Sequence, residues 1–203
     1  MRSVMIVMLC LPIAFLIIAQ PACAGAMVAK DPIGDTNQVA NGKRAPGYMD
    51  IVGEKLAKKG DVYVFSMEVA DPVPDRPVLS QGVKMMLWNW AIDSDSSVYY
   101  GAWPLPPGLL TWPEFHISIM WDGEKFSARL VDHRPLLTGG EEIFRELPFV
   151  VKGSELSLTV GAWIIDDITE FSWGASTSIW TGQLVGNYGY NLIDYIWWLP
   201  WQS

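Results

Sequence analysis

Cysteine and histidine are scarce in this chain of 203 residues, which contains two of each. Both cysteines, Cys10 and Cys23, precede residue 27. The rest of the chain therefore has no thiol for a disulfide, a zinc–thiolate site or a cysteine nucleophile. The histidines, His116 and His133, are too few for a multi-histidine metal site, and no H-E-x-x-H or G-x-S-x-G motif occurs. Zinc proteases and serine hydrolases are poorly supported for these reasons.

Positive charge is also in short supply. The chain has 14 lysines and arginines against 22 aspartates and glutamates, which gives a formal net charge of −8. A surface of this sign repels phosphate backbones and argues against nucleic-acid binding. It suits a secreted protein and a site for divalent cations.

Long apolar runs are confined to the N-terminus. Residues 4–19 read VMIVMLCLPIAFLIIA after Arg2, and PACAGA at 21–26 places small residues in A-x-A order. This pattern predicts a signal peptide over residues 1–26, followed by a single domain over 27–203. The predicted location is secreted, periplasmic or cell envelope. A membrane anchor is the alternative, although the run is short for a span and Pro12 interrupts it.

A helical period is missing after residue 26, and a period of two takes its place. DVYVFSMEV at 61–69 alternates between apolar and mixed positions. FHISIMWDGEKFSARLV at 115–131 reads as a hairpin with Asp122-Gly123 as a two-residue turn. FVVKGSELSLTV at 149–160 reads as a second hairpin that turns at Gly153-Ser154. These segments predict antiparallel strands.

Four further segments complete the prediction. MMLWNWAID at 85–93 is apolar on both faces, as expected of a central strand, and FSWGASTSIW at 171–180 supplies a late strand. MDIVGEKLAKKG at 49–60 is predicted as an edge strand. GEEIFREL at 140–147 could form one or two helical turns. The sequence predicts an all-β fold, an antiparallel sandwich or jelly roll. An open α+β layer lacks a convincing helix.

Aspartates cluster at turns and strand ends. Asp31 and Asp35 flank Pro32-Ile33-Gly34, and Asp93 and Asp95 follow the central strand. Residues i and i+2 of a strand point the same way, and calcium binds six to eight oxygens. The sequence therefore predicts a structural calcium site, while ordinary turn formation by aspartate is the alternative. The predicted ligands are Asp31, Asp35, Asp50, Asp93 and Asp95.

Tryptophan is abundant, with 11 residues in the chain. Trp88 and Trp90 share one strand face and are predicted to be core residues. Trp103 and Trp112 lie in the proline-rich segment WPLPPGLLTWP, where they could stack on the apolar face of a sugar ring. The aromatic tail YGYNLIDYIWWLPWQS at 188–203 is predicted to dock as a last strand. The alternative is an exposed patch that contacts an envelope protein or a membrane interface.

The segment from Asp31 to Asp95 resembles the start of secreted bacterial DOMON-like β-sandwiches, which include carbohydrate-binding-module-like domains and the glucodextranase C-terminal type. D-P-x-G-D at 31–35, the D-I pair at 50–51 that opens a strand, and WAIDSD at 90–95 carry the resemblance. It implies an ion site at the five aspartates named above. A related subset binds haem through methionine and histidine, which here would draw on His116, Met67, Met85, Met86 and Met120. The usual acidic Gly-Pro-Gly stretch is replaced by TNQVANGKRAPG, and the resemblance does not extend to the proline-rich segment or the residues after it.

The function predicted from the sequence is a secreted, non-catalytic module that binds carbohydrate or a cell-surface polymer, with a structural calcium ion. A structural or protein-interaction module of an envelope assembly is the alternative. A glycoside-active enzyme is a weaker one. It would need two carboxylates held in a cleft, drawn from Glu141, Glu142, Asp166, Asp167 and Glu170.

Overall fold

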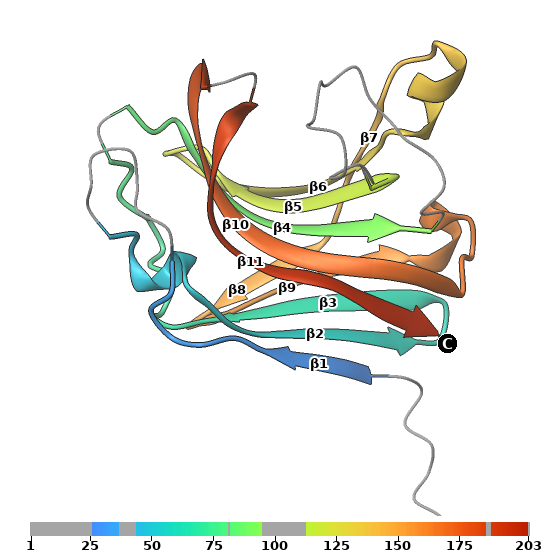
Figure 1. Ribbon diagram of the computed structural model, residues 1–203, viewed down its shortest axis with the longest axis horizontal. Helices are drawn as coiled ribbons and strands as arrows, with labels where there is room; N and C mark the ends of the chain where they lie inside the picture. The colour runs from blue at the N-terminus through green and yellow to red at the C-terminus, as the bar shows by residue number, and fades with distance from the viewer. Residues whose placement is uncertain (1–25, 37–43, 81, 95–112, 186–187, 203) are drawn as a thin grey trace, which may run out of the picture.

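Two antiparallel sheets pack face to face in the computed structural model of the chain (Figure 1). The structure describes residues 26–36, 44–80, 82–94, 113–185 and 188–202. The predicted all-β antiparallel sandwich is confirmed. Among the described residues, no helix is long and apolar enough to cross a membrane.

The strands follow a simple order in each sheet. The five-stranded sheet runs β1 (Ala26–Lys30), β2 (Ile51–Lys59), β3 (Val62–Val69), β9 (Glu155–Gly161) and β8 (Phe149–Lys152). The six-stranded sheet runs β11 (Tyr188–Gln202), β10 (Glu170–Val185), β4 (Met85–Asp93), β5 (Phe115–Trp121), β6 (Phe126–Asp132) and β7 (Ile143–Glu146). Short 3₁₀ turns occupy η1 (Gly47–Met49), η2 (Arg134–Thr138) and η3 (Ala162–Ile165).

Aromatic side chains fill the space between the sheets. Phe65 of β3 lies with its ring centroid 6.4 Å from that of Trp90 and 6.3 Å from that of Trp173. Trp88 and Trp90 are fully buried, so their predicted place in the core is confirmed. Each buried indole removes a large apolar area from water and so contributes strongly to stability.

The aromatic tail forms β11, the last strand of the six-stranded sheet, which pairs with β10. Trp201 is 1% exposed, and its indole centroid lies 5.9 Å from the Tyr63 ring on the facing sheet. The tail is therefore docked on the sandwich at Trp201, as predicted. The side chains of Trp197 and Trp198 lie outside the part that the structure describes.

Three local predictions are wrong. Segment 49–60 is not an edge, because β1 pairs with β2 from Ala26↔Ala57 to Lys30↔Gly53 and takes the edge itself. Segment 140–147 contains β7 rather than helical turns, and all four β7 residues are exposed. An exposed edge strand such as β7 has no buried face, so its sequence has no apolar period from which a strand could be predicted.

The third correction concerns the β5–β6 turn. Trp121 pairs with Phe126, so the loop has four residues rather than two. Asp122 Oδ1 accepts hydrogen bonds from the backbone amides of Glu124 and Lys125, both at 2.9 Å. The aspartate side chain closes this longer turn, which is why an Asp-Gly pair does not fix loop length.

Candidate metal centre

Four aspartates meet at the corner where β1, β2 and β11 approach one another. Asp31 directly follows β1, Asp35 follows four residues later, and Asp50 directly precedes β2. Asp194 comes from β11, in the opposite sheet. We call these four residues the acidic corner.

The turn between Asp31 and Asp35 is held by the start of β2. Gly34 has φ +88°, a left-handed conformation that favours glycine, and its amide donates to Asp50 Oδ2 at 2.8 Å. The Arg44 guanidinium donates to the Gly34 carbonyl. These contacts fold the D-P-x-G-D segment back over Asp50. The carboxylates of Asp31 and Asp35 therefore lie close to each other in the acidic corner.

Carboxylate oxygens of Asp31, Asp35 and Asp194 lie within 4.8 Å of one another. Asp194 is oriented by the backbone: its Oδ2 accepts from the Ile51 amide at 2.6 Å and its Oδ1 from the Tyr195 amide at 2.8 Å. Oxygens this close, all from carboxylates, form the kind of donor set that hard divalent cations prefer.

A β-bulge aims Asp194 into the corner. Thr177 of β10 pairs with Asp194, and Ser178 pairs with Leu192, which leaves Ile193 as the extra residue. Asp194 therefore shares the inward face of Thr177, whose hydroxyl donates to the Met49 carbonyl at 2.5 Å. A bulge re-aims side chains in this way, and Asp194 is 5% exposed as a result.

Buried oxygens in the corner lack donors. Asp50 is 5% exposed, and its Oδ1 has no hydrogen-bond partner, nor has Asp31 Oδ2. Among the described residues, no lysine or arginine forms an ion pair with any of the four aspartates. A buried carboxylate oxygen without a donor is costly, so either a cation or protonation of the carboxylates would stabilise the corner.

The pKa values of the corner point the same way. Burial, followed by the charges of Asp35 and Asp50, raises the pKa of Asp31 to about 6. Burial also raises the pKa of Asp194 to about 6, against the lowering effect of its two backbone hydrogen bonds. The pKa of Asp50 is raised as well, mainly by burial. Each raised pKa means that the surroundings disfavour the negatively charged form of the carboxyl. A bound cation would favour that form.

Glu54 extends the acidity into the core beneath the corner. It is 2% exposed, its Oε2 accepts from Trp90 Nε1 at 2.8 Å, and its Oε1 has no partner. Burial raises the pKa of Glu54 well above its ordinary value, and the charge of Asp31 adds to the effect. The surroundings of Glu54 therefore favour its protonated form.

The predicted calcium ligands are only partly brought together. Asp31, Asp35 and Asp50 meet, but Asp93 does not join them. Asp194 lies in register with Thr177 and Trp88, and Asp93 is five positions further along β4, roughly 16 Å away. Asp95 lies outside the described residues, as do Trp103 and Trp112.

Sequence reasoning missed Asp194. The signal was a single carboxylate in an otherwise apolar and aromatic strand, NLIDYIWW. Buried aspartates are rare unless paired, so a carboxylate at a core-facing strand position is informative. The bulge at Ile193 hid that position, because it breaks the alternation that assigns faces.

A second group of acids lies near η2 and contains its own cation. Arg134 donates through Nε and Nη2 to the two oxygens of Asp132, at 2.9 and 2.7 Å, and it also pairs with Asp166. Hydrogen bonds and the charge of Arg134 lower the pKa of Asp132 although that residue is buried. We call Asp132, Arg134 and Asp166 the arginine bridge.

The histidines sit beside this bridge. His116 Nδ1 lies 3.3 Å from His133 Nε2, and His133 Nδ1 lies 2.8 Å from Glu142 Oε1. Burial lowers the pKa of both, that of His116 to about 3. Met67 and Met86 are core residues, whereas His116 is on the outer face of β5. Met120 shares that face but is four positions, roughly 13 Å, along the strand, too far to share one iron with His116.

No protein-family model matches this chain, and no curated protein matches it.

Proposed function

We propose that this chain is a secreted, non-catalytic β-sandwich module that binds carbohydrate or another cell-surface polymer and is stabilised by one structural calcium ion. The observation that carries the proposal is the acidic corner, where carboxylate oxygens of three aspartates lie within 4.8 Å of one another. The resemblance to DOMON-like and carbohydrate-binding modules supports the polymer class.

Calcium fits the corner better than magnesium or zinc. The donors are carboxylates from Asp31, Asp35, Asp50 and Asp194, without nitrogen or sulfur. Their irregular origin, two from one turn, one from the residue before β2 and one from β11, suits the flexible coordination of calcium rather than the near-ideal octahedron that magnesium demands.

The role proposed for calcium is structural. Asp31 and Asp35 belong to the segment after β1, whereas Asp194 belongs to β11 of the other sheet. An ion held by both would join the first and last strands across the open side of the sandwich. Binding only to the folded state would then stabilise it by mass action.

The test is thermal unfolding of the protein without residues 1–26, in chelator and in saturating calcium. An ion at 100 times its dissociation constant adds about 2.7 kcal/mol. For a domain of this length, that should raise the melting temperature by roughly 5–10 °C. Magnesium at the same concentration should raise it less. Equal melting temperatures in chelator and calcium would remove the ion from the proposal.

Polymer binding needs its own assay, with calcium present throughout. Retention by insoluble polysaccharides and by purified cell walls, followed by elution with soluble oligosaccharides, would support the proposal. A protein that is retained by none of these but captures an envelope protein would favour the interaction-module alternative.

A further inference from the structure

Trp163 presents its indole to solvent. The five tryptophans of the core are at most 2% exposed, whereas Trp163 is 62% exposed. It lies on η3, which joins β9 to β10 at the end of the sandwich where β2 turns into β3 (Figure 1). The amide of Ala162 donates to the carbonyl of Asp61, in that turn, at 2.8 Å. Because tryptophan is usually highly buried, an indole exposed to this extent is a candidate contact for a ligand.

The indole rests against the backbone of Gly161. A Cβ atom at that position would lie 2.5 Å from Trp163 Nε1 and 2.9 Å from Trp163 Cδ1. Gly161 has φ −63° and ψ 134°, a conformation open to every residue, so glycine is needed here for space rather than for backbone freedom. A ring that is held in place before a ligand arrives loses little conformational entropy on binding.

A cation lies beside the ring. Arg145 belongs to β7, at the edge of the six-stranded sheet, and its guanidinium carbon lies 5.6 Å from the Trp163 ring centre. This cation–π contact joins η3 to β7 and holds the ring further. Arg145 is exposed and forms no ion pair with another described residue. Its guanidinium therefore brings several N–H donors close to an apolar ring.

Two carboxylates follow Trp163 in the next turn. Asp166 and Asp167 are both exposed, and both have φ +55°, a left-handed conformation that no other described residue except glycine adopts. The Asp166 amide donates to the Trp163 carbonyl at 3.4 Å, and the Asp167 amide donates to the Ala162 carbonyl at 2.9 Å. The ion pair between Arg134 and Asp166 ties this turn to the end of β6. Carboxylate acceptors are thereby held within one turn of the ring.

The composition of this surface matches a sugar. An apolar ring, a fork of N–H donors and carboxylate acceptors complement the C–H face and the hydroxyls of a pyranose. A folded protein partner would instead need a broad apolar centre. The exposed residues that follow Trp163 are polar: Asp166, Asp167, Thr169 and Glu170. Their carboxylates also repel a polymer of uronic acids, which favours an uncharged sugar.

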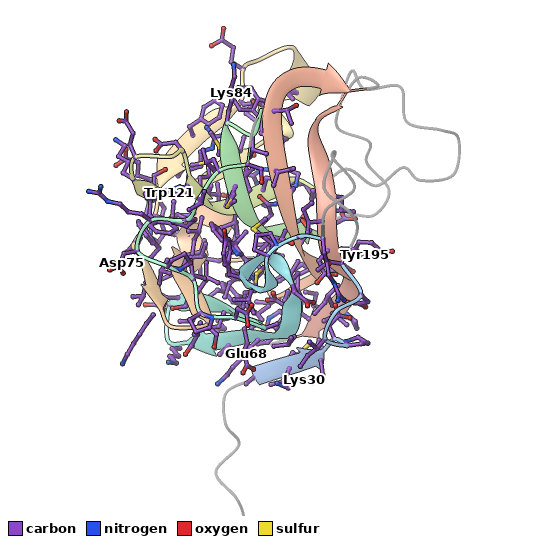
Figure 2. All side chains as sticks on the ribbon, turned by 90° about the vertical axis from the view of Figure 1, so that its left-hand side faces the viewer. Lys30, Glu68, Asp75, Lys84, Trp121 and Tyr195 are labelled. Carbon is purple, nitrogen blue, oxygen red and sulfur yellow. The ribbon has the colours of Figure 1, made fainter. Side chains whose placement is uncertain are left out.

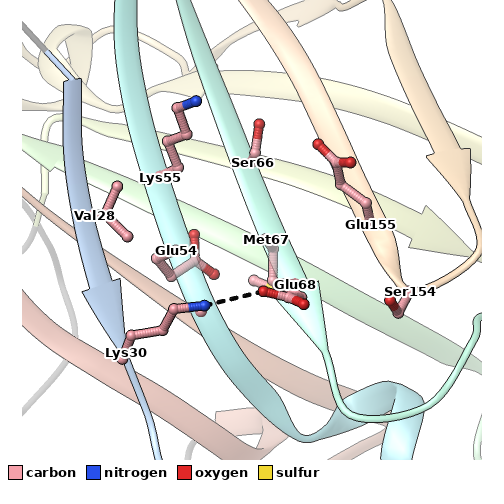
Figure 3. A pocket seen from close by; sticks show the side chains of 10 residues that line it. Val28, Lys30, Glu54, Lys55, Ser66, Met67, Glu68, Ser154 and Glu155 are labelled. Atoms are coloured by element: carbon pink, nitrogen blue, oxygen red, sulfur yellow. Dashed lines mark hydrogen bonds and ion pairs between the residues drawn. The ribbon is translucent and has the colours of Figure 1, made fainter.

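The outer face of the five-stranded sheet has a hollow but no aromatic ring in it. The hollow, of about 380 Å³, is lined by residues that include Lys55 and Glu155 and by no aromatic side chain. Lys30 and Glu68, at the bottom of Figure 2, also line it, and Lys30 Nζ lies 3.1 Å from Glu68 Oε2 (Figure 3). A neutral sugar there would compete with an ion pair and would have no surface on which to stack.

We infer that Trp163 is the stacking platform of a site that binds an uncharged sugar unit of a polysaccharide, with Arg145 as donor and Asp167 as acceptor for its hydroxyls. The inference rests on the proposed function, because it places the carbohydrate site and narrows the ligand to neutral sugars. The net charge of the protein, −8, likewise disfavours an anionic polymer.

Affinity electrophoresis in calcium tests the inference, with gels that contain soluble neutral polysaccharides (xylan, mannan, β-glucan) or anionic polygalacturonate. The unsubstituted protein should be retarded in at least one neutral gel. Trp163→Ala should bind that polymer at least tenfold more weakly, with an unchanged melting temperature because the side chain is exposed. The matched control is Phe144→Ala, which removes a ring that is 56% exposed and lies 5.4 Å from the Arg129 guanidinium. This control should bind as the parent does.

Gly161→Ala provides a second variant, which displaces the indole without removing any side chain. It should weaken binding severalfold with an unchanged melting temperature. If the parent is retarded and Trp163→Ala is retarded equally, Trp163 is not the platform, although the proposed function stands. Equal losses in Trp163→Ala and Phe144→Ala also overturn the platform, because any exposed ring would then serve. Retardation of the parent by polygalacturonate alone overturns the uncharged class. Retardation in no gel overturns both the site and carbohydrate binding.

Discussion

The acidic corner and the arginine bridge both contain a buried carboxylate, but the pKa of that carboxylate shifts in opposite directions. Asp132 is 5% exposed and receives two hydrogen bonds from Arg134, and its pKa falls. Asp194 is equally buried, has only backbone amides, and its pKa rises to about 6. The chain supplies a cation at the first place, and at the second the proposed calcium ion would supply one.

The difference shows what a buried charge requires. Desolvation opposes the charged form in both places, and at Asp132 the hydrogen bonds and the charge of Arg134 outweigh it. Arg44 is close enough to lower the pKa of Asp50, yet it forms no ion pair with the described corner aspartates. In the part of the chain that the structure describes, the corner therefore differs from an ordinary salt-bridge network, because no lysine or arginine pairs with its aspartates.

Removal of Arg134 should give the largest effect. Arg134→Ala leaves Asp132 buried without its partner, and loss of one member of a buried pair costs about 3 kcal/mol. Denaturant unfolding with calcium present measures this loss. The control Arg76→Ala removes an exposed arginine and should change stability by less than about 0.5 kcal/mol. Equal stability of the two variants would mean that the bridge contributes nothing.

The second prediction is a pH dependence in chelator. Asp31 and Asp194 have folded-state pKa values of about 6, above the ordinary 3.8, so protons stabilise the folded state. Their contribution is fully present below pH 3.8 and is lost as the pH rises through about 6. Each pKa unit corresponds to about 1.4 kcal/mol, which sets an upper bound for the decline.

Asp132 should behave in the opposite sense. Its folded-state pKa is lowered, so its contribution is present above pH 3.8 and is lost only as the pH falls below that value. Urea unfolding from about pH 2.5 to 8 in chelator, repeated in saturating calcium, separates the two regions. Calcium should abolish the decline toward neutral pH, and a decline of the same size in calcium would contradict a cation in the corner.

The fold and most of the acidic corner could be predicted from the sequence, but not every residue of the corner. The period of two, the Asp-rich turn and the buried Trp88 and Trp90 gave the sandwich and three corner residues. Asp194 could not be assigned, because a bulge shifts the face on which it lies. Asp93 was grouped wrongly with the corner, since strand-end position in sequence does not tell which end of the sandwich the strand reaches. The edge strand β7 was missed because all four of its residues are exposed, whereas β1 is short and has only a partly buried face.

The smallest expected effect is that of Asp31→Asn on stability, whose sign should differ between chelator and calcium. Asp31→Asn removes a repelling charge, so in chelator the variant should be more stable than the parent by about 1 kcal/mol. In saturating calcium it should be less stable, because a ligand has been lost. Melting curves in both conditions measure the crossing. The control Asp75→Asn, at an exposed loop residue, should change neither melting curve. An Asp31→Asn protein that is less stable than the parent in both conditions would contradict the cation site and indicate a purely structural aspartate.

Calcium titration calorimetry tests the central claim most directly. The parent protein should bind about one calcium ion per chain. Asp31→Asn and Asp194→Asn should each weaken binding at least tenfold, whereas Asp93→Asn should leave it unchanged. Absence of binding by the parent, or binding that Asp93→Asn abolishes and Asp31→Asn leaves intact, would contradict the acidic corner as the metal centre.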